Sequence, residues 1–409
     1  MARLEGCVVS FSVRRRRGIF PRVEFGLDYW LGGRRIRFVD PLSTHGDGDA
    51  GGHSPGSSEL EGLRSSGKRC SKKTSARIDW TQASRWLAEC HSEHDECASS
   101  GTSPGTLPAN FRVIDVERRC IVDTPPPDRN FVALSYVWGQ SPDPTKLHAT
   151  KSNMQRLLVD GSLSAAKMPR TVEDAMEACR RLGEPYLWVD RFCIVQDDAD
   201  DKGEQIAAMG AVYSLAKLVL LATDGHSDSG IAGVSHDRPQ KQLSYQIAGI
   251  TFTNAPVGWR EIINGSSAWS TRGWTYQEAI LPTRKLYLTE SQAFFECRRS
   301  VLSEDGSEEM AIYSPLGLRN QPWDPAVDVL YGHVSRYRAR KLTNLSDIYN
   351  AIDGVASALY GRFGSLWAGL PRQDFDRALL WSQNGLDGLA HRNEHGKTYM
   401  YPSWSWSSI

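Results

Sequence analysis

The sequence predicts an α/β fold in which a parallel β-sheet is flanked by helices. Apolar, β-rich segments at residues 131–136, 186–196 and 218–222 alternate with amphipathic segments in the middle of the chain. The connections are short and carry helix start and stop signals, which is typical of strand–helix–strand units with parallel neighbouring strands. A lead-in helix and strand are expected before this region. A mainly helical C-terminal region and a terminal strand are expected after it.

The first 77 residues are predicted to be poorly structured. Residues 44–75 are rich in Gly, Ser and charged side chains and poor in large apolar ones, so their burial cannot offset the entropy cost of ordering the backbone. We interpret them as a linker. Short basic runs at residues 14–17 and 68–73 are either solvated tail, the more common case, or a nuclear-import signal or a phosphate contact of a nucleic-acid-binding tail.

Residues 78–130 are predicted to supply a helix and a strand that lead into the main domain. Apolar side chains of the segment 78–97 fall on one helical stripe, namely Trp80, Ala83, Trp86, Leu87 and Cys90. Residues 111–122 alternate as a strand does, and the prolines at 125–127 end that pattern.

The main domain, residues 131–300, is predicted to begin with a buried strand that turns sharply at Gly139. The first long helix begins after Pro169, with Thr171 as the expected N-cap, and it ends before Gly183. Both ends of this helix are therefore marked in the sequence.

The second strand of the main domain, residues 186–196, is apolar except for Asp190 and Arg191, and an acidic turn follows it. The next helix places a set of apolar side chains on one face, namely Ile206, Met209, Tyr213 and Ala216. Residues 218–222 are the third strand.

Later elements are less regular in sequence. A hairpin, a short helix and one or two strands are expected at residues 242–253, 274–279 and 284–297, in that order. Residues 301–409 are predicted to form a mainly helical extension that packs on the main domain. Its last segment, residues 399–407, is expected to be a terminal strand with Trp404 and Trp406 on one face.

Composition places the chain among globular proteins. With 409 residues, 40% hydrophobic residues and 13 tryptophans, it can bury a substantial core. Its 48 basic and 48 acidic residues cancel, so no net field favours nucleic acid or an anionic membrane. No long apolar run indicates a membrane segment, and the N-terminus has the reverse charge order of a secretory signal. We therefore expect a cytoplasmic protein without a membrane segment.

One cluster of metal-binding residue types occurs in the lead-in helix. Cys90, His94 and Cys97 have helical spacing that places them on one face. Structural zinc normally takes four protein ligands, and no second pair lies nearby in sequence. The partly buried face of a polar helix is the better interpretation, and no metal site is predicted.

Ligands of parallel α/β sheets gather at the carboxyl ends of the strands. This rule selects the residues directly after the first strand, namely Ser135, Tyr136, Trp138 and Gly139. It also selects residues 193–201 after the second strand and residues 223–226 after the third. Asp190 is either a buried carboxylate with a raised pKa or the partner of Arg191 or Arg272 in an ion pair. Glu204 lies on the helix after that turn, and its spacing from Asp201 also fits a capping box.

Six segments in order resemble the HET domain, the heterokaryon-incompatibility domain of filamentous fungi. They are FVALSYVWG at 131–139, MPRTVEDA at 168–175, YLWVDRFCIVQDD at 186–198, STRGWTYQE at 270–278, FDRALLW at 375–381 and PSWSWSS at 402–408. The sequence departs from the family pattern at Val137, where many relatives have cysteine, and at Arg191, where serine is frequent.

The resemblance implies a fold and a possible chemistry. HET domains are thought to be distant relatives of TIR domains, which are flavodoxin-like, and many TIR domains cleave NAD with a glutamate on the helix after a central strand. Glu204 is the residue matched to that position. NAD is then the possible substrate, and no other cofactor is implied. Tyr136, Trp138 or Trp188 is the expected aromatic wall, and Arg191 or Arg272 the expected pyrophosphate partner.

The resemblance also implies a biological role. HET-domain proteins trigger growth arrest or cell death when genetically unlike fungal cells fuse, a form of self/non-self recognition and innate immunity. Self-assembly, or recruitment by a separate nucleotide-binding sensor, is the expected trigger. An NAD nucleosidase activity is the alternative mechanism, and a nucleic-acid contact through the basic N-terminal tail is a second alternative.

Overall fold

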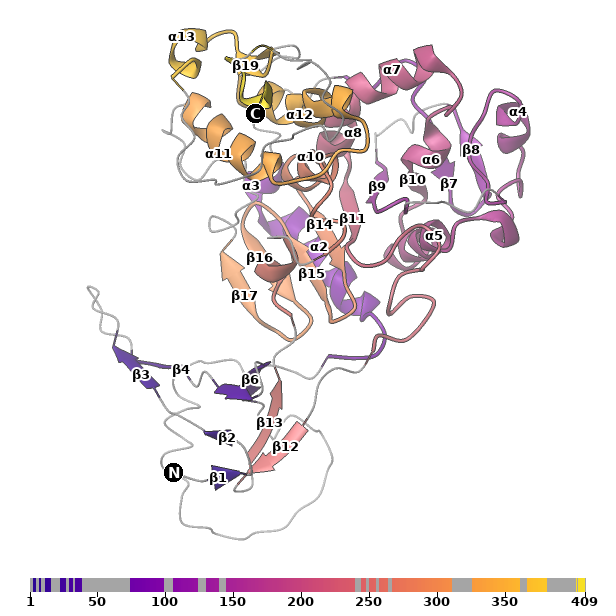
Figure 1. Cartoon of the computed structure of the whole chain (residues 1–409). Helices are drawn as coiled ribbons and strands as arrows, with labels where there is room; N and C mark the ends of the chain where they lie inside the picture. The colour runs from indigo at the N-terminus through magenta and orange to yellow at the C-terminus, as the bar shows by residue number, and fades with distance from the viewer. Residues whose placement is uncertain are drawn as a thin grey trace.

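A nine-stranded mixed β-sheet forms the centre of the protein in its computed structural model (Figure 1). The structure describes residues 74–98, 106–123, 130–139, 145–239, 257–263, 267–310, 326–360, 366–380, 402 and 404–408. It also describes the backbone of strands between residues 3 and 38 and at 244–247 and 250–254. The strand order in the sheet is β17-β16-β15-β14-β11-β9-β10-β7-β8.

The middle of this sheet is parallel, as the sequence predicts. Its strands are β10 (Tyr186–Trp188), β9 (Val132–Ser135), β11 (Leu218–Ala222) and β14 (Lys285–Leu288), in that spatial order. The chain therefore runs from β9 to β10 on one side, and then returns past β9 to β11 on the other. The connecting helices are α5 (Arg170–Leu182), α6 (Asp190–Cys193), α7 (Ala199–Ala207), α8 (Met209–Leu215) and α10 (Thr275–Ile280). Shorter turns of helix at α4 (Met154–Leu157), η2 (Ala165–Lys167) and α9 (Trp259–Glu261) complete the connections.

Antiparallel strands extend the sheet at both edges. The lead-in segment supplies the hairpin β7 (Val113–Asp115) and β8 (Cys120–Val122) beside β10. The other edge carries β15 (Ala293–Glu296), β16 (Ser300–Ser303) and β17 (Glu308–Met310). Helices α2 (Trp80–Glu93) and α3 (Asp95–Ala98) belong to the lead-in, and α2 contacts α5 and β15. The lead-in is thus part of the same sheet as the main domain.

Both faces of the sheet are buried, because alternate residues of each parallel strand point to opposite cores. In β11, Val219 and Leu221 join a core with α8, α10, α11 and α12, whereas Leu218 and Leu220 join a core with α2 and α5. This two-sided burial explains why the strands read as continuous apolar runs.

The predicted C-terminal extension begins within the sheet, because residues 301–303 belong to β16 and residues 308–310 form β17. The described part of the C-terminal region from residue 326 on is mainly helical. It consists of α11 (Ala326–Arg338), η5 (Leu345–Ile348), α12 (Asn350–Tyr360), the hairpin β18 (Leu366–Trp367) and β19 (Leu370–Pro371), α13 (Phe375–Ala378) and η6 (Trp406–Ser408). Figure 1 shows these elements together beside α8 and α10, and α12 contacts both of those helices.

The predicted terminal strand is wrong over its described residues. Residues 404–408 form a turn and a 3₁₀ helix, because Ser405 accepts a hydrogen bond from the Ser407 backbone N–H at 3.2 Å. Trp406 is buried and donates to the Gly369 carbonyl at 2.7 Å. The segment closes the core as a plug rather than as a strand.

Three boundaries also differ from the sequence predictions. The second strand ends at Trp188, because Asp190 begins the helical turn α6. The expected strand at residues 111–122 is a hairpin that turns at Arg119, which has a φ of 52°. Pro169 is the N-cap of α5, while the Thr171 hydroxyl donates to the His226 carbonyl at 2.7 Å.

The described N-terminal segments, between residues 3 and 38, are short strands. They are β1 (Arg3–Leu4), β2 (Cys7–Val8), β3 (Ser12–Arg15), β4 (Val23–Gly26), β5 (Tyr29–Leu31) and β6 (Arg34–Phe38). β6 pairs with the predicted hairpin, β12 (Ser244–Ile247) and β13 (Ile250–Asn254). The linker prediction for residues 44–75 lies almost entirely outside the described residues. In the described part of the chain, every helix is too short or too polar to cross a membrane.

A close approach between α8 and α12 gives a stability prediction. A Cβ atom added to Gly210 would lie 2.9 Å from the Gly354 Cα atom, so the two helix backbones would have to separate. We expect Gly210→Ala to lower the free energy of unfolding by about 1–3 kcal/mol. Gly332 in α11 has open space at the same position, so Gly332→Ala is the matched control and should stabilise by up to about 1 kcal/mol. Urea unfolding of both variants measures the difference, and equal effects would contradict the close approach.

Candidate active site

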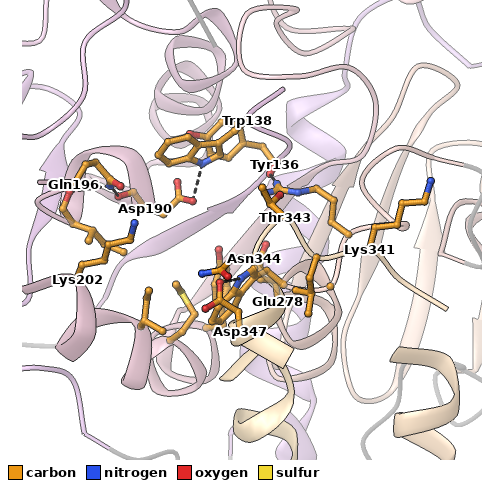
Figure 2. A pocket seen from close by; sticks show the side chains of 18 of the residues that line it. Tyr136, Trp138, Asp190, Gln196, Lys202, Glu278, Lys341, Thr343, Asn344 and Asp347 are labelled. Carbon is orange, nitrogen blue, oxygen red and sulfur yellow. Dashed lines mark hydrogen bonds between the residues drawn. The ribbon is translucent and has the colours of Figure 1, made fainter. Parts of the chain in front are cut away.

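A pocket lies where the carboxyl ends of β9 and β10 meet, next to the reversal of strand order between β9 and β11. Its volume is about 250 Å³ (Figure 2). Tyr136 and Trp138 follow β9, and Asp190 follows β10, so they enter the pocket from neighbouring strands. Open α/β sheets bind ligands at this kind of position. The sequence rule therefore located the pocket.

The other walls come from segments that are distant in sequence. Helices α7 and α8 supply Lys202, Ile206, Met209 and Tyr213, and the segment from Arg272 to Glu278 supplies the opposite side. The turn that follows α11 closes the mouth with Lys341, Leu342, Thr343, Asn344 and Asp347. Lys202 and Lys341 are exposed, so two cations stand at the rim of the pocket.

Glu278 is the buried carboxylate of this pocket. It lies on α10 and accepts a hydrogen bond from the Ser135 hydroxyl, which in turn accepts one from Trp269 Nε1 at 2.6 Å. Burial raises the pKa of Glu278 to about 7, and the Ser135 hydroxyl and Arg272 partly offset this rise. A carboxyl group that titrates near neutral pH in a pocket has the property of a catalytic acid or base.

Asp190 is the second carboxylate of the pocket, and it is half-buried. Its Oδ2 atom accepts from Trp138 Nε1 at 2.8 Å, and its Oδ1 atom accepts from the Arg191 backbone N–H at 2.7 Å. Burial raises the pKa of Asp190, so the raised-pKa alternative agrees with the structure. The Tyr136 hydroxyl lies close to this carboxylate. Burial of the Tyr136 side chain raises its pKa, and the negative charge of Asp190 adds to this rise.

Two arginines predicted for the site have different positions. Arg272 lines the pocket and donates from Nη1 to the Tyr136 carbonyl at 2.8 Å. Arg191 is buried behind the pocket wall, with its guanidinium 5.3 Å from the centroid of the Trp138 ring and its Nε donating to the Leu147 carbonyl. Arg191 therefore supports Trp138 and is not placed to reach a ligand.

The structure brings together only part of the predicted site. Tyr136, Trp138, Asp190 and Arg272 line the pocket. Ser135 reaches it through Glu278, whereas Gly139 has a φ of 92° and lies against His226.

Glu204 is exposed on α7 and is not among the residues that line the pocket. The capping-box alternative for Glu204 is wrong, because Asp198 is the N-cap of α7 and accepts from the Asp200 and Asp201 backbone N–H groups. Asp201 instead pairs with Arg112 at 2.9 Å and is buried.

Sequence reasoning missed Glu278, although the quoted segment STRGWTYQE ends on it. The helix that carries it follows β11 only after the long segment 223–274, which hides the usual strand-to-helix spacing. The available signal was a glutamate at the end of a helix between two parallel strands.

The raised pKa of Glu278 predicts a pH dependence of stability. The folded protein holds this proton more tightly than the unfolded chain, whose carboxyl pKa is near 4.5. Protonated Glu278 therefore adds on the order of 3 kcal/mol to the free energy of unfolding. This stabilisation is complete below pH 4.5 and is lost as the pH rises through about 7. We expect Glu278→Gln to flatten this part of the stability profile, measured by urea unfolding between pH 5 and pH 8. A profile identical to that of the wild type would contradict the raised pKa.

Comparisons with known proteins find a family match in the middle of the chain. The family model for the heterokaryon incompatibility protein (HET) matches residues 131–278. The chain is similar to heterokaryon incompatibility protein 6, OR allele, of Neurospora crassa, with 33% identity over 114 residues. That match covers 25% of this chain and 16% of the relative. No solved structure matches the chain.

The matched range runs from the residue before β9 to Glu278, so it encloses the parallel strands β9, β10 and β11 and most residues that line the pocket. Residues 131–278 therefore match the HET domain family, and this part of the chain carries the pocket at the carboxyl ends of its strands.

Proposed function

We propose that this protein acts in heterokaryon incompatibility and that its HET domain cleaves NAD in the pocket at the carboxyl ends of β9 and β10. The family match and the similarity to the Neurospora crassa protein support the role. The buried carboxylate of Glu278, with a pKa near 7, is the observation that carries the proposed chemistry.

The strand order supports a flavodoxin-like relationship for this domain. In chain order the parallel strands are arranged as second, first, third and fourth, which is the order of that class. The resemblance to TIR domains implies a catalytic glutamate on the helix after a central strand. Glu204 and Glu278 both lie on helices that follow parallel strands, but only Glu278 lines the pocket. We therefore propose Glu278 as the catalytic carboxylate and Glu204 as the alternative.

The chemistry requires few groups. The bond between ribose C1′ and the pyridinium nitrogen breaks, and its electron pair stays on nitrogen, so neutral nicotinamide leaves. The ionised Glu278 carboxylate would stabilise the positive charge that develops on the ribose. Water then adds to C1′ and loses a proton to the carboxylate, giving ADP-ribose.

The remaining lining groups suit a dinucleotide. Tyr136 and Trp138 would provide the aromatic wall, and Arg272, Lys202 and Lys341 provide positive charge for the pyrophosphate. The cavity, about 250 Å³, is below the range of roughly 300–1,000 Å³ typical of whole-ligand pockets. We therefore expect it to hold the reacting nicotinamide riboside half, with the adenosine half at the open mouth.

Self-assembly is a second route by which the domain would act in a cell-death response. Large apolar side chains are exposed around α13, with Trp367 at 53% and Leu380 at 80%. Exposed apolar groups of this kind favour contacts between protein copies. In this case assembly would either raise the rate of NAD cleavage in the pocket or act as the signal without NAD cleavage.

Nicotinamide release from NAD by the purified chain tests the proposal, before and after chemical cross-linking at high protein concentration. Release that is proportional to protein concentration, or that begins on cross-linking, supports the enzymatic function. Intact NAD in both samples, together with a defined oligomer, would favour signalling by assembly alone.

A further inference from the structure

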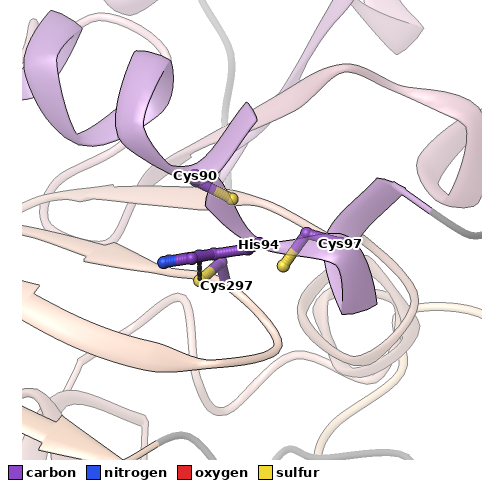
Figure 3. A group of neighbouring side chains, drawn as sticks. All are labelled: Cys90, His94, Cys97 and Cys297. Atoms are coloured by element: carbon purple, nitrogen blue, oxygen red, sulfur yellow. Dashed lines mark hydrogen bonds between the residues drawn. The ribbon is translucent and has the colours of Figure 1, made fainter. Parts of the chain in front are cut away.

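Four metal-binding side chains meet on the face of the sheet opposite the pocket helices. They are Cys90, His94, Cys97 and Cys297, and their ligand atoms all lie within 4.8 Å of one another (Figure 3). The three cysteines are buried, and His94 is half-buried. Around a zinc ion with Zn–S bonds of about 2.3 Å, the sulfur atoms of a tetrahedron lie about 3.8 Å apart. The side chains need only small rotations to reach that geometry.

The fold explains how the set is assembled. Cys90 lies on α2, and this helix ends at His94, whose φ of −108° and ψ of 88° break the helical path. The chain re-enters a helix at α3, and Cys97 thereby turns back toward Cys90. Cys297 follows β15 directly and arrives from more than 190 residues further along the chain, with its sulfur 3.4 Å from His94 Nδ1. The sequence pattern identified the other three residues as a cluster, and the fold adds Cys297 as the fourth.

The surroundings stabilise negative charge on sulfur. Arg284 Nε donates to the Cys90 sulfur at 3.2 Å. N–H donors and cations around sulfur are the outer-shell partners that thiolate ligands use in metal centres.

Binding of a divalent cation by the three thiols would release their protons to solvent.

We propose that Cys90, His94, Cys97 and Cys297 form a structural zinc site that ties the lead-in helices α2 and α3 to the sheet at β15. Three thiolates and one imidazole make the Cys₃His set that zinc adopts in structural sites. All four positions are filled by protein side chains, so none is open for a substrate. Soft thiolate ligands in tetrahedral arrangement favour zinc over magnesium, calcium or manganese.

The proposed site would hold the lead-in helices against the sheet. The lead-in helix α2 is held to the sheet through contacts with β15 and α5. A zinc ion would join α2, α3 and β15 by four bonds across a loop of about 200 residues, which constrains the unfolded chain strongly. Removal of the metal should therefore loosen the lead-in segment while the pocket on the other face remains.

Metal analysis of the full chain, purified without a metal-affinity tag and dialysed, tests the proposal. We expect about one zinc per chain by mass spectrometry. Cobalt added to the chelated protein should give the intense visible bands of a tetrahedral cobalt–thiolate centre, a signature that a merely packed thiol cluster does not produce. Cys297→Ser and His94→Ala should each lose the zinc and these bands.

Matched variants separate ligand loss from unfolding. His91 is an exposed neighbour on α2 and Cys179 a buried thiol on α5, so His91→Ala and Cys179→Ala should keep one zinc per chain. His94→Cys should keep the metal as a four-thiolate site. The proposal is overturned if the wild type binds neither zinc nor cobalt stoichiometrically, or if Cys297→Ser binds as much as Cys179→Ala does.

Discussion

Replacement of Glu278 by glutamine is expected to lower the rate of nicotinamide release from NAD by at least about 100-fold. The reason is that glutamine keeps the shape of the side chain but cannot carry the negative charge that would stabilise the developing oxocarbenium ion. Its amide oxygen still accepts the hydrogen bond of the Ser135 hydroxyl, so the pocket should keep its form. Nicotinamide release, followed by chromatography at matched protein concentration, measures the change.

Glu204→Gln is the matched control for this prediction. Glu204 is exposed on α7 and outside the pocket lining, so its replacement should leave nicotinamide release near the wild-type rate. Melting temperatures of both variants near or above that of the wild type would exclude unfolding as the cause. The opposite pattern, with Glu204→Gln inactive and Glu278→Gln active, would assign the catalytic role to α7.

Replacement of Glu296 by alanine is expected to destabilise the protein by about 3–5 kcal/mol. Glu296 on β15 is the direct cross-strand partner of Lys285 on β14, with a separation of 2.9 Å and both side chains almost fully buried. It also accepts the Tyr287 hydroxyl at 2.6 Å. Its loss would leave a buried ammonium group whose remaining acceptor among the described residues is the Ala279 carbonyl, at 3.0 Å. Urea unfolding at pH 7 measures the effect.

A double variant tests whether the buried charge is the cause. In Lys285→Met with Glu296→Gln, the cation is gone and glutamine still accepts the Tyr287 hydroxyl, so most of the lost stability should return. The exposed pair Arg118 and Asp160 gives a contrast, because its removal should have a small effect. A double variant as unstable as Glu296→Ala would contradict this explanation.

The central alternation of strands and helices was predictable because both its signals are local. Continuous apolar runs in β9 and β11 reflect burial on two faces, and Gly183 ends α5 with a φ of 74°. The position of the pocket followed from the parallel topology. The residues that complete the pocket could not be predicted in this way. Lys341 and Glu278 reach it through long-range packing, which residue spacing in the sequence does not indicate.

The errors have a common physical origin. Short segments whose side-chain pattern predicts a strand form helical turns instead, because hydrogen bonds between nearby groups stabilise the turn. Asp190 starts a helical turn directly after an apolar strand and accepts a hydrogen bond from the Arg191 backbone N–H, and the Ser405 hydroxyl accepts one from the Ser407 backbone N–H. Likewise, three of the four proposed zinc ligands were visible in sequence, and only the fold brings Cys297 to them.

The location of bound NAD in the Glu278→Gln protein tests the central claim most directly, because this variant should bind the substrate without consuming it. A crystal structure with NAD is expected to place the nicotinamide ring between the Tyr136–Trp138 wall and residue 278, with the pyrophosphate near Arg272 or Lys341. Density for the nucleotide outside this pocket, on the exposed face of α7 beside Glu204 or elsewhere, would contradict the account.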